Sequence, residues 1–393
     1  MIATVVGAFP LGMFSLAILL FVRDRTGSLA EAGLAVGVFG VGNAVGLILQ
    51  GRLIDRIGQS AVLAPAGLVC AAGSVLLVTA ASAAGSMAFR LVVTGGLGCA
   101  IPATTGSMRV LLGETIAEPE TRIAGYALLA VAFQLALLTG PLVTAALLAP
   151  VGPGGAVVTA GALAGVAGVL FAVTGASRAW RPHRAHPAES GYRMRRGLVA
   201  LLLVAAGGGL SAGLFTVAVP AAALAHGAAA ESGPLIAMSA AGEIVGATAF
   251  GARRRRGSTT RHLLVALTGS TIAAGLVACV SDHITWLFPA ALFAGTCSGP
   301  FAITVSALLD TVAPRTALTR SYTLMVSVSL LAGSLGSSAG GAIVSAAGYR
   351  LLFTVNACWL ACLLAIGVLV RRAFTQTAVT NVAAGRTGQA RRR

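Results

Sequence analysis

The chain contains twelve runs of apolar residues, each about as long as a helix that crosses a lipid bilayer. A spanning helix needs about 20 apolar residues, because the hydrocarbon core is about 30 Å thick. The runs do not alternate as β-barrel strands do, so only helices remain to satisfy the backbone inside a bilayer. We place the spans at residues 2–22, 31–50, 61–82, 88–112, 123–148, 155–175, 197–221, 233–252, 262–281, 285–309, 321–346 and 350–371. The predicted fold class is an all-α membrane protein.

The composition and motifs exclude several other classes of protein. Only 10% of the residues are charged, whereas soluble domains carry about 25%. The six cysteines lie inside apolar runs and show no metal-ligand spacing. No GxSxG, HExxH or P-loop pattern occurs. We therefore expect no enzyme activity, no cofactor and no metal.

The arginines predict how the chain is oriented in the membrane. All 27 basic residues are arginine; with the N-terminus in the cytoplasm, 23 fall in inner loops or the C-terminal tail and 3 in outer loops. This asymmetry follows the positive-inside rule. We therefore expect the protein in the plasma membrane, with both termini in the cytoplasm. Arginines facing anionic lipid also explain the net charge of +16, so we expect no nucleic-acid partner.

The chain divides into two six-helix halves. A Pro-, Arg- and His-containing cytoplasmic linker, 177–196, separates an N-terminal half, 1–176, from a C-terminal half, 197–372; a disordered cytoplasmic tail is expected over 373–393. A shift of 200 residues places Gly42, Asn43 and Gly46 on Gly242, Glu243 and Gly246, and Gly95 on Gly295, and a shift of 198 places Pro102 on Pro300. The recurring glycines suit helix packing in lipid, where close backbone approach is favoured. We therefore interpret the two six-helix halves as pseudo-repeats.

A short polar segment, GRLIDRIGQ at 51–59, follows the second span as a hinge. It resembles the G-x-L-x-D-R-x-G signature of the major facilitator superfamily (MFS), which lies between transmembrane helices 2 and 3: Gly51, Leu53, Asp55, Arg56 and Gly58 match, and Gln59 stands where a basic residue is usual. The resemblance covers about residues 1–372. It implies two six-helix halves related by an axis along the membrane normal and transport by alternating access.

By this resemblance, the segment acts as a conformational latch on the cytoplasmic side. Gly51, Asp55, Arg56 and Gly58 would form it, with the carboxylate of Asp55 meeting a helix N-terminus, which carries partial positive charge. The alternative is that the charges only anchor the topology.

Glu243 is the carboxylate nearest the middle of a span. Such residues are costly in lipid and usually functional, and desolvation favours the neutral acid. We expect Glu243 to be a proton-coupling or cation-binding residue. The alternatives are a hydrogen bond between helices and a position near the membrane surface.

Arg90, near the outer end of the fourth span, is the second coupling candidate. Family members often carry an arginine here in an R-x-x-x-G pattern, and in this chain the glycine, Gly95, arrives one position late. The alternative is an arginine that extends to the outer interface.

Gly140 and Pro141 in the fifth span resemble the core of the antiporter motif of drug-exporting family members. The glycines expected around that core are replaced by Ala127, Ala136 and Thr144. The resemblance implies export rather than import. The alternative is a proline kink that neighbouring helices tolerate.

Asn43, Gln134 and Asn356 are uncharged polar residues inside spans, where each either lines a substrate cavity or bridges two helices. The first and seventh spans, which flank the cavity in this family, add only Ser15, Ser211 and Thr216. A mostly apolar cavity suits a lipophilic substrate better than a sugar.

The sequence therefore predicts a monomeric secondary transporter that exchanges a small amphipathic organic compound, a drug or a metabolite, for protons. Its partners are that substrate, the proton and the lipid bilayer. A proton-coupled importer of a small metabolite is the first alternative. A non-transporting membrane receptor is the second, although no loop exceeds about twenty residues.

Overall fold

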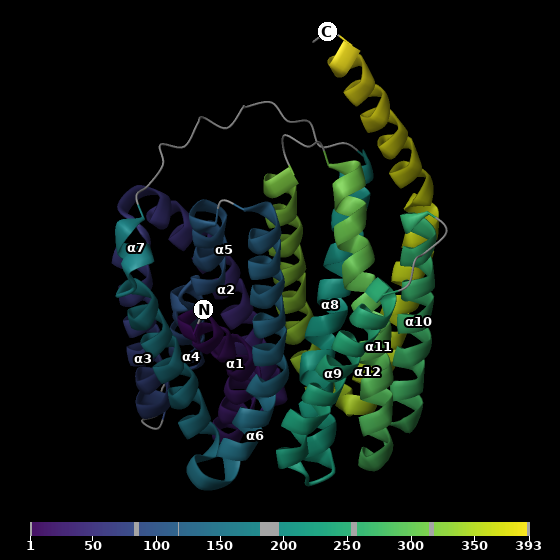
Figure 1. Cartoon of the computed structure of the whole chain (residues 1–393). Coiled ribbons are helices and arrows are strands. Elements are labelled where there is room, and N and C mark those ends of the chain that lie inside the picture. Colours follow the sequence, from purple (N-terminus) through teal and green to yellow (C-terminus); the bar gives the residue numbers. More distant parts are fainter. Residues whose placement is uncertain are drawn as a thin grey trace. The chain divides into compact units, whose positions relative to one another are not determined.

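The structure is a computed structural model that describes residues 2–81, 86–116, 118–180, 196–252, 258–313 and 318–390. Within these ranges the regular secondary structure is entirely helical, which confirms the all-α prediction. In chain order the elements are α1 (Ile2–Thr26), α2 (Leu29–Ile57), α3 (Gln59–Ala81), α4 (Met87–Ala100), α5 (Thr104–Thr115), α6 (Pro119–Ala172), α7 (Gly175–Ala179), α8 (Arg196–Ala225), the 3-10 turn η1 (Ala229–Glu231), α9 (Ser232–Ala252), α10 (Thr259–Val280), α11 (Ile284–Val312) and α12 (Leu318–Ala390) (Figure 1).

Two of the long helices are each a pair of consecutive spans. Ten segments of the described residues are long and apolar enough to cross a membrane. Within α6 the backbone turns at Gly152, with φ 68° and ψ −179°, and within α12 it turns at Gly348, with φ 81° and ψ 172°. These conformations favour glycine, which has no Cβ. The turns fall between predicted spans five and six and between spans eleven and twelve, so each of the twelve predicted spans has a helical counterpart.

The segment predicted as a polar hinge is mostly helix. α2 continues through residues 51–57 and only Gly58, with φ 94° and ψ 161°, leaves the helical conformation before α3 begins at Gln59. The residues after Gly51 contain no proline and include good helix formers such as Arg and Leu, so the helix has no local reason to stop earlier.

The linker and the tail differ in how much of them the structure describes. Residues 181–195 of the predicted linker lie outside the described residues, and α7 occupies the segment just before them. α12 continues as helix to Ala390, where the sequence analysis expects a disordered tail. No proline follows Phe374 to interrupt it. Residues 391–393 are outside the described ranges.

The chain forms two compact units. One contains Met1–His186, Thr216–Ala237 and Ser337–Gly348, and the other contains Pro187–Phe215, Met238–Gly336 and Tyr349–Arg393. The first unit has a buried apolar cluster that gathers α1, α2, α3, α5 and α6 around Leu63 and Phe171. The second has a larger cluster that gathers α8, α10, α11 and α12 around Leu201 and Leu308.

Candidate functional site

Glycines bring α2 and α4 into backbone contact in the first unit. A Cβ at Gly42 would collide with the main chain of Gly95, and one at Gly46 with the main chain of Cys99. Gly98 in turn faces the main chain of α2 at Phe39 and Asn43. Helices in lipid gain most from such close packing, so we call this contact between α2 and α4 the glycine seam of the first unit.

The second unit repeats this seam between α9 and α11. Gly242 and Gly246 lie against the main chain of Leu292 and Thr296, and Gly295 lies against the main chain of Ser239 and Glu243. Matching the contacts gives an offset of 200 between α2 and α9, as the sequence predicts. Between α4 and α11 the offset is 197, so Gly98 and not Gly95 is the counterpart of Gly295. The sequence alignment of Gly95 with Gly295 is therefore wrong, because in a glycine-rich helix several registers give similar matches.

Asn43 and Glu243 occupy matching positions on α2 and α9. The backbone nitrogen of each faces a glycine of the partner helix, Gly98 for Asn43 and Gly295 for Glu243. Asn43 is buried, with 8% of its surface exposed, and Glu243 is partly buried. The main-chain oxygen of Glu243 also faces Gly299. The two halves thus carry a neutral amide and a carboxylic acid at the same structural position.

Arg90 pairs with an acid that the sequence analysis did not single out. Its Nη2 donates to Oε2 of Glu31 across 2.8 Å, and the two side chains are 14% and 29% exposed. Glu31 lies in the first turn of α2, where its backbone N–H donates to the Ser28 hydroxyl that caps the helix. The Ser-x-x-Glu spacing of a capping box is the sequence signal that marks Glu31. The ion pair joins the predicted outer ends of α2 and α4.

The latch residues lie at the end of α2. Asp55 and Arg56 are both exposed in its last turn, and Gly58 ends the helix. A Cβ at Gly51 would meet nothing within 4 Å. Of the two motif glycines, only Gly58 is therefore required by the backbone of this structure. Next to the motif, the Ser60 hydroxyl donates to the Ala172 carbonyl over 2.9 Å at the end of α6.

Gly140 and Pro141 lie where α6 crosses α1. A Cβ at Gly140 would lie 2.8 Å from main-chain atoms of Gly12, so the two helices touch through their backbones. Thr144, which replaces a motif glycine, is fully buried, and its hydroxyl donates to the Gly140 carbonyl over 3.1 Å. The contact explains why small residues occupy this part of the motif.

The remaining cavity candidates differ in their surroundings. The Ser211 hydroxyl of α8 donates to Oδ1 of Asn356 in α12 over 2.7 Å, and this bond is buried. Nearby, Nε1 of Trp359 donates to the Gly207 carbonyl over 2.9 Å. Asn356 therefore bridges two helices. Gln134 is half-buried in α6.

Gln50 is a second residue that the sequence analysis missed. It is 5% exposed, lies near the C-terminal end of α2, and makes three hydrogen bonds to the main chain around the end of α4. Its only sequence signal is a polar side chain at the end of an apolar run.

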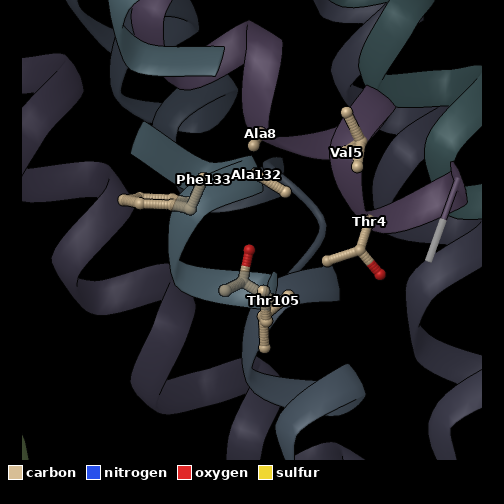
Figure 2. Close-up of a pocket in the computed structure, with 7 residues that line it drawn as sticks. Thr4, Val5, Ala8, Thr105, Ala132 and Phe133 are labelled. Atoms are coloured by element: carbon tan, nitrogen blue, oxygen red, sulfur yellow. The ribbon is translucent and has the colours of Figure 1, made fainter. Parts of the chain in front are cut away.

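A small pocket lies at the predicted inner end of the first unit. Figure 2 shows Thr4, Val5 and Ala8 of α1 facing Thr105 of α5, with Phe133 of α6 on one side. The lining is mostly apolar, and the buried Thr4 hydroxyl has no hydrogen-bond partner among the described residues. Among all the residues that the structure describes, no group of three or more His, Cys, Asp or Glu side chains could hold a metal ion.

Comparisons with known proteins agree with this architecture. The family model described as "Major Facilitator Superfamily" matches residues 1–258. No curated protein gives a significant match. Among solved structures, a bacterial homologue of the human lysosomal transporter Spinster, in an inward-facing and unoccupied conformation, is 15% identical, with 96% of each chain covered and a TM-score of 0.74. The nucleoside transporter NupG is 12% identical, with 96% of this chain and 97% of its own covered and a TM-score of 0.71. At these identities the similarity shows the fold alone.

Because the family model covers well over half of the chain, the protein belongs to the Major Facilitator Superfamily and is a multi-pass membrane transporter rather than an enzyme.

Proposed function

We propose that this transporter exports a small amphipathic organic compound in exchange for protons, by alternating access between its two six-helix halves, 1–176 and 197–372. The observation that carries the proposal is the matched pair of Asn43 and Glu243. Each residue lies at the equivalent position of the glycine seam in its own half, yet of the two only Glu243 can gain and lose a proton. An ionisable side chain retained inside a span is costly and usually functional.

The coupling machinery in this proposal contains a second charged element. The ion pair of Arg90 and Glu31 joins α2 and α4, two helices that also meet through the Asn43 seam. Arg90 then acts on α2 and α4, the helix pair of the first half that corresponds to α9 and α11, which carry Glu243. We assign to it the holding of these helices in one state of the cycle.

The latch in this proposal consists of Gly51, Asp55, Arg56 and Gly58. Asp55 and Arg56 are exposed at the end of α2, where a carboxylate is available to meet the partly positive N-terminus of another helix. The single-residue turn at Gly58 ends α2 just after these two residues, so both belong to the last turn of the helix.

The lipophilic substrate class is supported by the polar groups that are already engaged. The hydroxyl of Ser211, one of the few polar groups of the seventh span, is bonded to Asn356. A sugar or another strongly hydrated substrate demands many hydrogen-bonding partners from its site, since each polar group left unpaired on burial costs free energy. Asn43 and Gln134 remain candidates for substrate contact.

Export rather than import is supported by the antiporter-like segment at Gly140 and Pro141. Its backbone contact with Gly12 preserves the close helix packing that the motif's small residues serve. The protein would act as a monomer. The excess of arginines in the loops on one side of the predicted topology supports a plasma-membrane location with both termini in the cytoplasm.

The proposal is tested in a host that lacks its main exporters. Cells expressing the protein are loaded with a panel of lipophilic dyes and antibiotics, with and without a protonophore. We expect lower accumulation of at least one compound, abolished by the protonophore. Glu243→Gln should lose this export at equal amounts of protein in the membrane, whereas Glu231→Gln, which removes a carboxylate just before the same helix, should keep it.

The same cells distinguish the alternative. Because one structural neighbour is a nucleoside transporter, radiolabelled uridine is the import probe. Proton-dependent uptake of uridine, with no compound exported, would replace the export proposal by import. Full export by Glu243→Gln would remove Glu243 from the coupling mechanism.

A further inference from the structure

The fourth span is broken in the middle. α4 ends at Ala100 and α5 begins at Thr104; Ile101, with φ −59° and ψ 121°, and Ala103, with φ −74° and ψ 48°, are not helical. Between them Pro102 has no N–H to donate. A helix end leaves main-chain groups without intrahelical partners, and inside a membrane water does not replace them.

The side chain of Gln50 supplies the missing partners. Its Nε2 donates to the carbonyl of Cys99 over 2.9 Å and to that of Ile101 over 2.7 Å. Its Oε1 accepts the N–H of Ala103 over 3.0 Å. A primary amide has two donors and an acceptor oxygen, so this one group serves the last carbonyls of α4 and the entry of α5 together.

The break redirects the span from one pair of neighbours to another. α4 packs on α2 and α3, whereas α5 packs on α1 and α6. Gln50 belongs to α2, so its amide ties α2 to the beginning of α5. It lies five residues before Asp55, and therefore on the same helix end that carries the latch.

The second half provides an internal comparison. At the offset of 200 that relates α2 to α9, the counterpart of Gln50 is Phe250, which has no amide. α11, the counterpart of α4 and α5, is a continuous helix from Ile284 to Val312 although Pro300 lies inside it. A proline alone therefore does not break a span in this fold, and the break occurs in the half that has the glutamine.

The geometry points to Gln50 as a positioning residue that clamps a hinge in the fourth span. When the amide is present, the two pieces are held at a fixed angle. When it is removed, the hinge at residues 101–103 opens while α4 and α5 themselves remain helical. The inference holds for either direction of transport and for any substrate.

Hydrogen–deuterium exchange of the full-length protein in lipid nanodiscs tests the clamp. In Gln50→Leu we expect amides in residues 101–106 to exchange at least about tenfold faster, because the Ala103 N–H loses its acceptor and its neighbours lose their anchor. Peptides from the interior of α4 and from residues 298–303 of α11 should be unchanged. Phe250→Leu is the matched control and should leave both regions unchanged.

Gln50→Glu adds a readout that simple packing would not give. An ionised carboxylate accepts from Ala103 but repels the two carbonyls, whereas a protonated one has a single O–H that donates to one of them. The protection of residues 101–106 against exchange, measured relative to that of residues 298–303 in the same molecule, should therefore recover as the pH falls. Unchanged exchange in Gln50→Leu, equal acceleration in both halves, or a Gln50→Glu variant without pH dependence would each overturn the clamp.

Discussion

Nη2 of Arg90 in α4 lies 2.8 Å from Oε2 of Glu31 in the first turn of α2, although 59 residues separate them in the chain. Both side chains are more than two-thirds buried, so water screens this ion pair only weakly. The pair lies where α2 begins, and the glycine contacts between α2 and α4 lie further along the two helices.

Removing either partner should destabilise the protein. For Glu31→Gln and Arg90→Gln we expect a loss of about 1–3 kcal/mol, because a poorly solvated charge loses this charged hydrogen-bond partner. The double variant should lose less than the sum of the two. Thermal unfolding in detergent measures the effect. The exposed pair of Asp282 and Arg350 is the control, and its loss should cost less than about 1 kcal/mol. Equal effects at both pairs would contradict the assignment.

Gly140→Ala should disturb the crossing of α1 and α6. The new Cβ would press on the main chain of Gly12, and overpacking of this kind costs about 1–3 kcal/mol. Gly96→Ala is the control: its Cβ meets open space and it gains up to about 1 kcal/mol of helix propensity. Unfolding temperatures of the two variants give the comparison, and a stable Gly140→Ala protein would show that the crossing relaxes freely.

The two glycines of the latch should respond in opposite ways. Gly58→Ala forces a side chain into a backbone conformation with φ 94° and ψ 161°, which is nearly restricted to glycine and should cost about 1–3 kcal/mol. Gly51→Ala adds a Cβ in open space within a helix and should be neutral or stabilising. Membrane yield and unfolding temperature report both. If Gly51→Ala abolishes transport while the protein folds normally, Gly51 is needed in another state of the cycle.

Asn356 should behave as a bridge between helices. Ser211→Ala leaves its buried Oδ1 without this donor, so we expect a loss of about 1 kcal/mol. Replacing both residues, as Ser211→Ala with Asn356→Leu, should be closer to neutral than the sum of the single changes. The unfolding free energies of the four proteins form the cycle. An Asn356→Leu protein that keeps its stability but raises the KM for a transported compound would instead place Asn356 in the substrate cavity.

Features that depend on local patterns were predictable from the sequence. Apolar runs of about twenty residues located the spans, including the pairs that turn at Gly152 and Gly348. The Asp55–Arg56 segment pointed to the family, and the offset of 200 correctly aligned Asn43 with Glu243. Each of these features depends only on residue types and on their spacing along the chain.

The rest required the tertiary structure, because it depends on how far each helix is rotated and shifted against its neighbour. Hydropathy is the same for many rotations of an apolar helix, so it could not show that Arg90 meets Glu31 or that Gly98 matches Gly295. The break in the fourth span is the clearest case. Pro102 and Pro300 each lie inside a predicted span, yet the helix is broken at Pro102 and continuous through Pro300. The hydrogen bonds of the Gln50 amide to Cys99, Ile101 and Ala103 depend on how α2 packs against the fourth span, which no sequence pattern shows.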